Sequence, residues 1–231
     1  MALKTYPITL PFSVHTTNQK KLWESSVEKR VDTLWEREKA KRGEHLFNGT
    51  TLLVDFIGPA SVSVTSSEYK YFLAQSLDST LRSEMKLRAL AVTGLASYQD
   101  SILLGKRSQT VQTEAGVWEL VPAGGVTSDK IRSDGNVDFL QQLLQELEEE
   151  TGLAGNAVQD LKPFALVEDE TLGTLDIGIE ISLKSLDSLL TSSEEYEKIH
   201  LVPRNKLSSF SLENSMAPVS KKFLEKIYGH I

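Results

Sequence analysis

Three glutamates in one short segment have the spacing that metal or acid–base chemistry requires. Glu146, Glu149 and Glu150 stand at positions i, i+3 and i+4, so that on a helix their carboxylates gather on one face. Like charges at this spacing repel one another, and the negative pole of the helix dipole adds to the repulsion near the C-terminal end. We therefore expect a positive charge to offset them. Carboxylate oxygens suit Mg²⁺ or Mn²⁺; the alternative is an acidic face exposed to solvent.

The segment 137–151 has the pattern of the helix that would carry these glutamates. Its leucines form an apolar stripe on another face, at Leu140, Leu143, Leu144 and Leu147. Gly152 follows as the predicted helix stop. Upstream, the predicted strand 118–121 enters the glycine turn Pro122-Ala123-Gly124-Gly125. A strand, a glycine turn, a loop and an acidic helix therefore follow one another along the chain.

The remaining pattern places strands before and after this helix, which is typical of an α+β fold built as an α/β/α sandwich. Further helices are predicted over 18–41 and 217–228. Strands or strand-like patterns are predicted over 51–57, 62–72, 90–98, 102–107, 161–167 and 174–183. The polar stretch 76–88 is the best candidate for a boundary. We expect a small N-terminal α+β domain over residues 1–85 and a second domain over residues 86–231.

Composition narrows the classes of function. The chain has 231 residues, a formal net charge of -7 and no cysteine. The negative charge disfavours nucleic acid as a partner, and the lack of cysteine excludes disulfides, thiolate nucleophiles and cysteine-type zinc sites. Residues 1–17 lack the apolar core of a signal peptide, and no apolar stretch approaches the roughly 18 residues of a membrane span. We expect a soluble cytoplasmic protein; its oligomeric state stays open.

The glycine turn and the acidic helix together resemble the Nudix box, the motif of Nudix hydrolases. Its consensus is Gly, five residues, Glu, seven residues, then Arg-Glu-U-x-Glu-Glu-x-Gly-U, in which U is aliphatic. Gly125 and residues 145–153 match it, except that Gln145 stands where the family has arginine. The segments 103–108 and 118–125 resemble the strands that lead into the box. The resemblance covers roughly residues 86 to 231.

The front half of the box departs further from the consensus. The gap from Gly125 to Gln145 is longer, and Val137 stands where the first glutamate belongs, with Asp138 as its nearest substitute. We interpret the extra length as an insertion in the loop 126–136, which is rich in turn formers. Gln145 brings no charge to brace a neighbouring carboxylate, so weaker metal affinity or a slower enzyme is expected.

The resemblance implies a Nudix fold with a mixed sheet and hydrolysis of a diphosphate with Mg²⁺, or Mn²⁺, as cofactor. Members of the family hold the metal with glutamates of the box, which correspond here to Glu146, Glu149 and Glu150. The backbone carbonyl of Gly124 or Gly125 is expected nearby, because a residue without Cβ lets the main chain approach closely.

A general base is expected from Glu149 itself or from a carboxylate outside the box. The candidates outside it are Glu170, in the loop 168–173, and Glu195 or Glu197, in the segment 193–197. Each has an alternative interpretation as a carboxylate in a solvated loop. The resemblance to the Nudix box does not indicate which of these carboxylates is the general base.

Candidate substrate contacts come from basic and aromatic residues. Lys106 and Arg107 end a predicted strand and are candidates for phosphate oxygens, with edge-strand charges as the alternative. Phe47, Tyr69 and Tyr71 are candidates for stacking on a nucleobase, with core packing as the alternative.

A narrower resemblance suggests a substrate. Leu34-Trp35-Glu36, Leu46-Phe47-Asn48-Gly49 and Tyr69-Lys70-Tyr71-Phe72-Leu73 are similar to segments of the UDP-sugar diphosphatase branch. That resemblance implies UDP-glucose or UDP-galactose as substrate, with UMP and sugar 1-phosphate as products. The alternatives are ADP-ribose or another dinucleotide, a non-catalytic nucleotide-binding module, and an acidic helix with a structural role alone.

Overall fold

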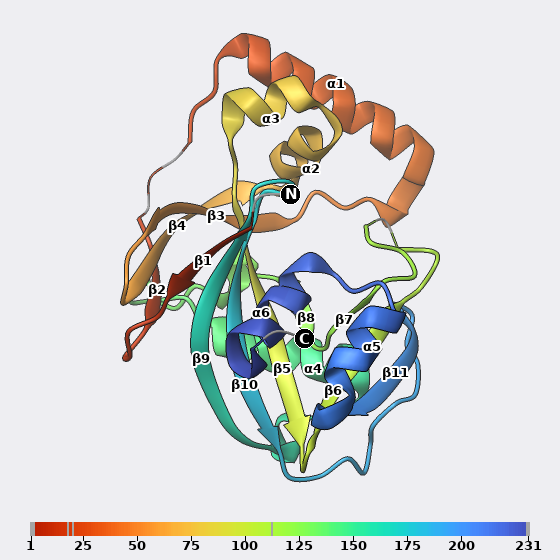
Figure 1. Cartoon of the computed structure of the whole chain (residues 1–231). Coiled ribbons are helices and arrows are strands. Elements are labelled where there is room, and N and C mark those ends of the chain that lie inside the picture. Colours follow the sequence, from red (N-terminus) through yellow and green to blue (C-terminus); the bar gives the residue numbers. More distant parts are fainter. Residues whose placement is uncertain (1–2, 18, 20, 112, 230–231) are drawn as a thin grey trace.

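The computed structural model describes residues 3–17, 19, 21–111 and 113–229 (Figure 1). Its strands join in one mixed sheet, in the order β1-β9-β10-β5-β3-β4-β2. In addition, β6 and β8 pair with β5, and β7 and β11 pair with β6. The strands are β1 (Leu3–Pro7), β2 (Ser13–Thr16), β3 (Thr50–Ile57), β4 (Ser61–Glu68), β5 (Ala89–Tyr98), β6 (Ser101–Arg107), β7 (Trp118–Leu120), β8 (Ala123–Gly125), β9 (Val158–Asp169), β10 (Thr174–Leu183) and β11 (Tyr196–Pro203). The pairs β5–β10 and β2–β4 are parallel, and the other paired strands are antiparallel.

Helices lie on both faces of this sheet and at one end of it (Figure 1). They are α1 (Ser25–Arg42), α2 (Tyr69–Leu77), α3 (Ser79–Met85), α4 (Phe139–Thr151), α5 (Leu207–Glu213) and α6 (Pro218–Tyr228). Leu143 and Leu147 of α4 share a core with Ile177 of β10. Phe223 and Leu224 of α6 belong to a second core, on the other side. The predicted α+β sandwich is confirmed. None of the helices within the described ranges is long and apolar enough to cross a membrane.

The first 85 residues contribute both to the sheet and to the helices above its end. Val31 of α1 and Leu81 of α3 are fully buried in a core that also contains Leu53 of β3. β1 pairs along β9, and Leu53 pairs with Ala89 at the start of β5. Hydrogen bonding therefore runs continuously between both parts of the chain, and their division at residue 85 stays a prediction.

One sequence-based prediction near α2 was wrong. The strand predicted over 62–72 ends at Glu68, and α2 begins at Tyr69. The aromatic residues there suit either element. The consecutive residues Leu73, Ala74 and Gln75 are all buried on α2, whereas a strand would point them to alternate faces. The polar stretch 76–88 contains the helix α3, because the Asp78 side chain accepts hydrogen bonds from the first free N–H groups of that helix.

The N-terminal helix is shorter than predicted. α1 begins at Ser25 rather than near residue 18; of the preceding positions, Asn18 and Lys20 lie outside the described residues. The other predicted helices match α4 and α6 to within two residues at each end. α4, which carries the acidic segment, is therefore in the predicted place.

Candidate functional site

The helix α4 and the short strand β8 touch at one glycine. β8 is held on β5 by the pairing of Gly124 with Val92. A Cβ atom added to Gly124 would lie 2.3 Å from Oε1 of Glu146, whereas one added to Gly125 meets nothing within 4 Å. Only glycine at position 124 therefore lets the Glu146 carboxylate lie against the main chain of β8. The close approach predicted for this turn falls on Gly124 rather than on Gly125.

Glu150 lies one helical turn further along and is buried. Its Oε2 accepts a hydrogen bond of 3.1 Å from the backbone N–H of Ala123, and its Oε1 lies 3.5 Å from the oxygen of the Tyr196 hydroxyl group. Burial raises the pKa of Glu150 well above its ordinary value, and the negative charges of Glu195 and Glu146 raise it further.

Glu146 is less buried than Glu150, but the negative charge of Glu195 acts on both side chains. Burial is the largest cause that raises the pKa of Glu146, to about 7. The Gln142 side chain donates a 2.6 Å hydrogen bond to Glu146, which lowers that pKa, whereas Glu149 and Glu195 raise it. Lys130 is the cation that lowers it. Repulsion among carboxylates is thus only partly offset by protein cations.

Glu149 is exposed to solvent, unlike the other two glutamates of the box. Its Oε1 accepts a 2.8 Å hydrogen bond from Nε2 of Gln145, one turn earlier on α4. The residue in place of the box arginine thus orients a box glutamate without bringing a charge. Among the residues that the structure describes, no three acidic or histidine side chains are preassembled as a metal-binding group.

Glu195 joins this group from outside the helix. An ion pair of 3.0 Å links its Oε1 to Nη1 of Arg107, and its charge raises the pKa of both Glu146 and Glu150. Of the carboxylates predicted outside the box, Glu195 is therefore the one that the structure places beside α4.

Glu119 and Tyr196 are further members that sequence reasoning missed. Glu119 accepts hydrogen bonds from Arg107 at 2.5 Å and from the Tyr196 hydroxyl group at 2.6 Å. Burial raises the pKa of Glu119, whereas Arg107 lowers it. The one available clue was an acidic residue between the apolar neighbours Trp118 and Leu120. We call Glu119, Glu146, Glu149, Glu150 and Glu195 the glutamate cluster.

Strand register explains why Lys106 and Arg107 have different surroundings. Side chains of successive strand residues point to opposite faces. Arg107 faces the glutamate cluster, and its Nε also donates to the backbone carbonyl of Thr113 at 3.0 Å. Lys106 instead pairs with Glu197 at 2.5 Å. Lys106 and Glu197 were both predicted as site residues. They pair with each other, away from Arg107 and the glutamate cluster.

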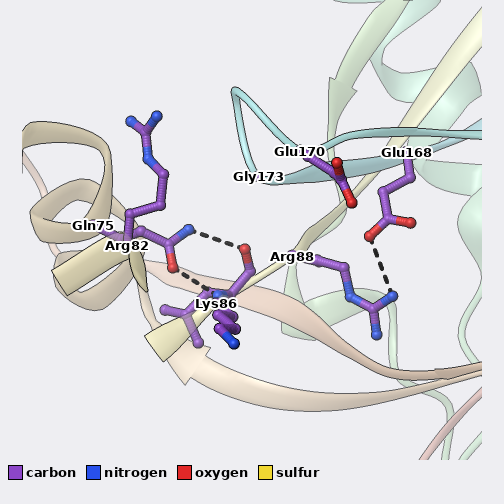
Figure 2. Close-up of a pocket in the computed structure, with 8 residues that line it drawn as sticks. Gln75, Arg82, Lys86, Arg88, Glu168, Glu170 and Gly173 are labelled. Carbon is purple, nitrogen blue, oxygen red and sulfur yellow. Dashed lines mark hydrogen bonds and ion pairs between the residues drawn. The ribbon is translucent and has the colours of Figure 1, made fainter. Parts of the chain in front are cut away.

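Glu170, the other predicted base, lies in a different pocket. It follows β9 and pairs with Lys4 of β1. Figure 2 shows it beside Arg88, Glu168 and Gly173. The structure thus does not bring Glu170 together with the glutamate cluster.

The predicted aromatic contacts lie among the N-terminal helices. Phe47 is 80% exposed. Tyr69 packs with Trp35, Leu46 and Leu73, so that the three segments resembling the UDP-sugar branch meet in one apolar cluster. Burial raises the pKa of Tyr69. Tyr69 also lines a cavity of about 370 Å³, whose wall includes Thr113.

Asp138, the proposed substitute for the first box glutamate, caps α4. Its Oδ1 accepts a 3.1 Å hydrogen bond from the backbone N–H of Gln141, and its other oxygen pairs with Arg132. The carboxylate at the start of the helix is therefore used for capping.

Comparison with known proteins finds similarity in structure but not in sequence. No protein-family model matches the chain, and no curated protein matches it. Solved structures similar to it include a MutT protein from Methanosarcina mazei, with 24% identity and a TM-score of 0.45 over 59% of this chain and 90% of that chain. A MutT Nudix hydrolase from Burkholderia pseudomallei has 19% identity and a TM-score of 0.45, over 60% and 96% of the two chains.

A third similar structure is the bifunctional NMN adenylyltransferase/ADP ribose pyrophosphatase from Francisella tularensis, complexed with AMP and a Mn ion. It has 17% identity and a TM-score of 0.49, and the similarity covers 68% of this chain and 45% of that chain. Similarities of this size do not decide activity or substrate, so function has to be inferred from the glutamate cluster itself.

Proposed function

We propose that this protein is a Nudix-type diphosphatase that hydrolyses a nucleoside diphosphate-linked compound with the help of Mg²⁺ or Mn²⁺. The observation that carries the proposal is the contact of α4 with β8. Glu146 lies against Gly124 and Glu150 against Ala123, and Glu195 lies close enough to raise the pKa of both glutamates.

The donor chemistry of the glutamate cluster fits a divalent cation. Several carboxylates share one region with few compensating cations, and their mutual repulsion would be relieved by a bound positive ion. We propose Glu146, Glu149 and Glu150 as its ligands, with the backbone carbonyl of Gly124 or Gly125. When bound, such an ion neutralises diphosphate oxygens and makes a water molecule more acidic.

Glu195 is our preferred candidate for the general base. It is 40% exposed in its side chain and anchored by Arg107, so it is both reachable by solvent and oriented. Glu149, exposed on α4, is the alternative. Glu170 is disfavoured, because Lys4 neutralises it in a separate pocket.

For the substrate we propose UDP-glucose or UDP-galactose, cleaved to UMP and sugar 1-phosphate. The choice of a UDP-sugar rests on the sequence resemblance alone. The cavity beside Tyr69 is the proposed place for the nucleoside. Its wall includes Thr113, whose backbone carbonyl accepts a hydrogen bond from Arg107, the residue that pairs with Glu195 of the glutamate cluster. ADP-ribose or another dinucleotide is the alternative substrate.

A non-catalytic nucleotide-binding module is the second candidate function. Two observations favour it: the neutral Gln145 replaces the box arginine, and Asp138 is engaged in capping. Under this hypothesis the cluster still binds metal and nucleotide but does not release phosphate.

One assay separates these functions. Purified protein is incubated with Mg²⁺ and a panel of UDP-glucose, UDP-galactose, ADP-ribose and dinucleotides, and products are converted to phosphate by a coupled phosphatase. We expect phosphate release that is abolished in the double variant Glu149→Ala/Glu150→Ala. Full activity in that variant contradicts the catalytic assignment, and tight binding of UDP-glucose without turnover over hours supports the binding module.

A further inference from the structure

A buried amide side chain connects the glutamate cluster to the loop 126–136. Gln142 lies on α4, one helical turn before Glu146, and is only 4% exposed. Its Nε2 donates a 2.6 Å hydrogen bond to Oε1 of Glu146. Proteins mostly leave glutamine exposed, because a buried amide is destabilising unless both of its ends have hydrogen-bonding neighbours. The neighbours of Gln142 therefore have to account for its burial.

The hydrogen bond from Gln142 fixes how the Glu146 carboxylate is turned. The oxygen that accepts it, Oε1, is also the atom that a Cβ atom on Gly124 would meet first. Oε1 thus lies between the amide of Gln142 and the main chain of β8. Within the described part of the chain, no hydrogen bond or ion pair engages the other oxygen, Oε2. Glu146 can therefore offer Oε2 to a cation without giving up either contact of Oε1.

The other end of the amide faces the loop 126–136. Oε1 of Gln142 lies 3.3 Å from the hydroxyl oxygen of Thr127, which also donates to Asp129. Asp129 in turn pairs with Lys130. The backbone carbonyl of Lys130 accepts a 2.8 Å hydrogen bond from the N–H of Asp138, the capping residue of α4. The first part of the loop, up to Lys130, is therefore tied to the helix.

Two glutamines of α4 each orient a box glutamate four residues later, but their surroundings differ. Gln145 bonds Glu149 at 2.8 Å, and both of these side chains are exposed, so that water competes for the same groups. Gln142 is buried, and little water competes for its bond to Glu146. Of the two glutamines, Gln142 is therefore the one that holds a carboxylate firmly.

We propose that Gln142 is a positioning residue for the metal ligand Glu146, and that the loop 126–136 holds Gln142 in place through Thr127. The inference rests on the proposed function, in which Glu146 binds Mg²⁺ or Mn²⁺. The box arginine is absent at position 145, and Gln142 orients a ligand from a different position of the same helix. Because its amide is neutral, it does so without repelling the metal ion. The extra loop length brings Thr127 to this amide.

Titration calorimetry with Mn²⁺ on the full chain, without nucleotide, tests this role. Gln142→Met keeps the length of the side chain and removes the donor. We expect it to raise the Kd for Mn²⁺ about 10-fold, the lower end of what outer partners of metal ligands contribute. The matched control is Gln141→Met, because Gln141 is the exposed neighbour on the same helix. It should change the Kd less than about twofold.

Two further measurements separate positioning from a loss of folding. Thr127→Val removes the hydroxyl group at the loop end of the contact with little change in volume, and it should raise the Kd for Mn²⁺ about threefold. The melting temperature of Gln142→Met in EDTA should equal that of the wild type, because the hydrogen bond acts on metal binding rather than on the core.

The outcomes distinguish this inference from the proposed function. Equal Kd values for Gln142→Met and Gln141→Met overturn the inference and leave the diphosphatase proposal intact. An unchanged Kd in Thr127→Val overturns the part assigned to the loop. Binding of Mn²⁺ by the wild type without phosphate release from any substrate overturns the diphosphatase alone, since the Kd comparison still holds. A wild type that does not bind Mn²⁺ overturns both.

Discussion

Arg107 and Glu195 form an ion pair of 3.0 Å between the last residue of β6 and the residue before β11. The same guanidinium donates to Glu119, which in turn accepts from Tyr196. Tyr196 also reaches Glu150 of α4. Hydrogen bonds and ion pairs thus link the positive charge of Arg107, on β6, to α4, where Gln145 is neutral.

Replacement of Arg107 should slow turnover more than it weakens substrate binding. We expect Arg107→Gln to lower kcat by roughly 10–100-fold, since Glu195 loses its anchor, with KM changed less than threefold. Arg107→Lys should recover part of the loss. Steady-state kinetics with the best substrate of the panel measures both constants.

The matched control for Arg107 is its neighbour on β6. Lys106→Gln removes the same charge from the opposite face of the strand, where Lys106 pairs with Glu197. It should leave kcat within about twofold of the wild type. Equal losses of kcat in both variants would contradict a positioning role for Arg107.

Substitution by alanine should have a large effect at one of the two adjacent glycines of β8 and little effect at the other. In Gly124→Ala the new Cβ would collide with the Glu146 side chain. We expect a loss of activity of about 100-fold or more, because that carboxylate must swing away, and only a small change in the free energy of unfolding. Gly125→Ala has open space and should change either quantity little. Activity assays and urea unfolding compare them, and similar activity of the two variants would argue against the close contact.

Asp176 should make stability depend on pH. Burial raises the pKa of Asp176 to about 6, although hydroxyl groups of Thr93 and Thr174 donate to it. The folded state therefore binds this proton more tightly than the unfolded state does. The contribution of Asp176 to the free energy of unfolding is complete below the pKa of aspartate in the unfolded chain, and it is lost as pH rises through about 6. The loss amounts to roughly 3 kcal/mol.

Asp176→Asn should remove this dependence. Urea unfolding at pH 4 and pH 7.5 is expected to show that the variant gains stability relative to the wild type only at the higher pH. If the substitution destabilises the protein equally at both pH values, Asp176 is not held protonated by its surroundings.

Divalent metal should stabilise the fold through the glutamate cluster. At a Mg²⁺ concentration of about 100 Kd, binding contributes roughly 2.7 kcal/mol, which corresponds to a rise in melting temperature of about 5–10 °C. EDTA should reverse the rise and abolish turnover. The double variant Glu146→Gln/Glu150→Gln should show no such rise, and an unchanged response would place the metal elsewhere.

The local features of the site were predictable from the sequence because they depend on residues close together in the chain. Helical periodicity places Glu146 and Glu150 on the same face of α4, the capping glycine 152 ends the helix, and glycine at 124 allows a close approach. These features need only the repeat of a helix and the absence of a Cβ atom.

The partners of the glutamates were decided only by the tertiary structure. Arg107, Glu119 and Tyr196 come from three strands, and they meet because β6 pairs with both β7 and β11 in a particular register. The same long-range packing separated Glu195 from Glu170 and turned the aromatic segment 69–72 into a helix. Strand register depends on the burial of residues far apart in the chain, which local spacing does not encode.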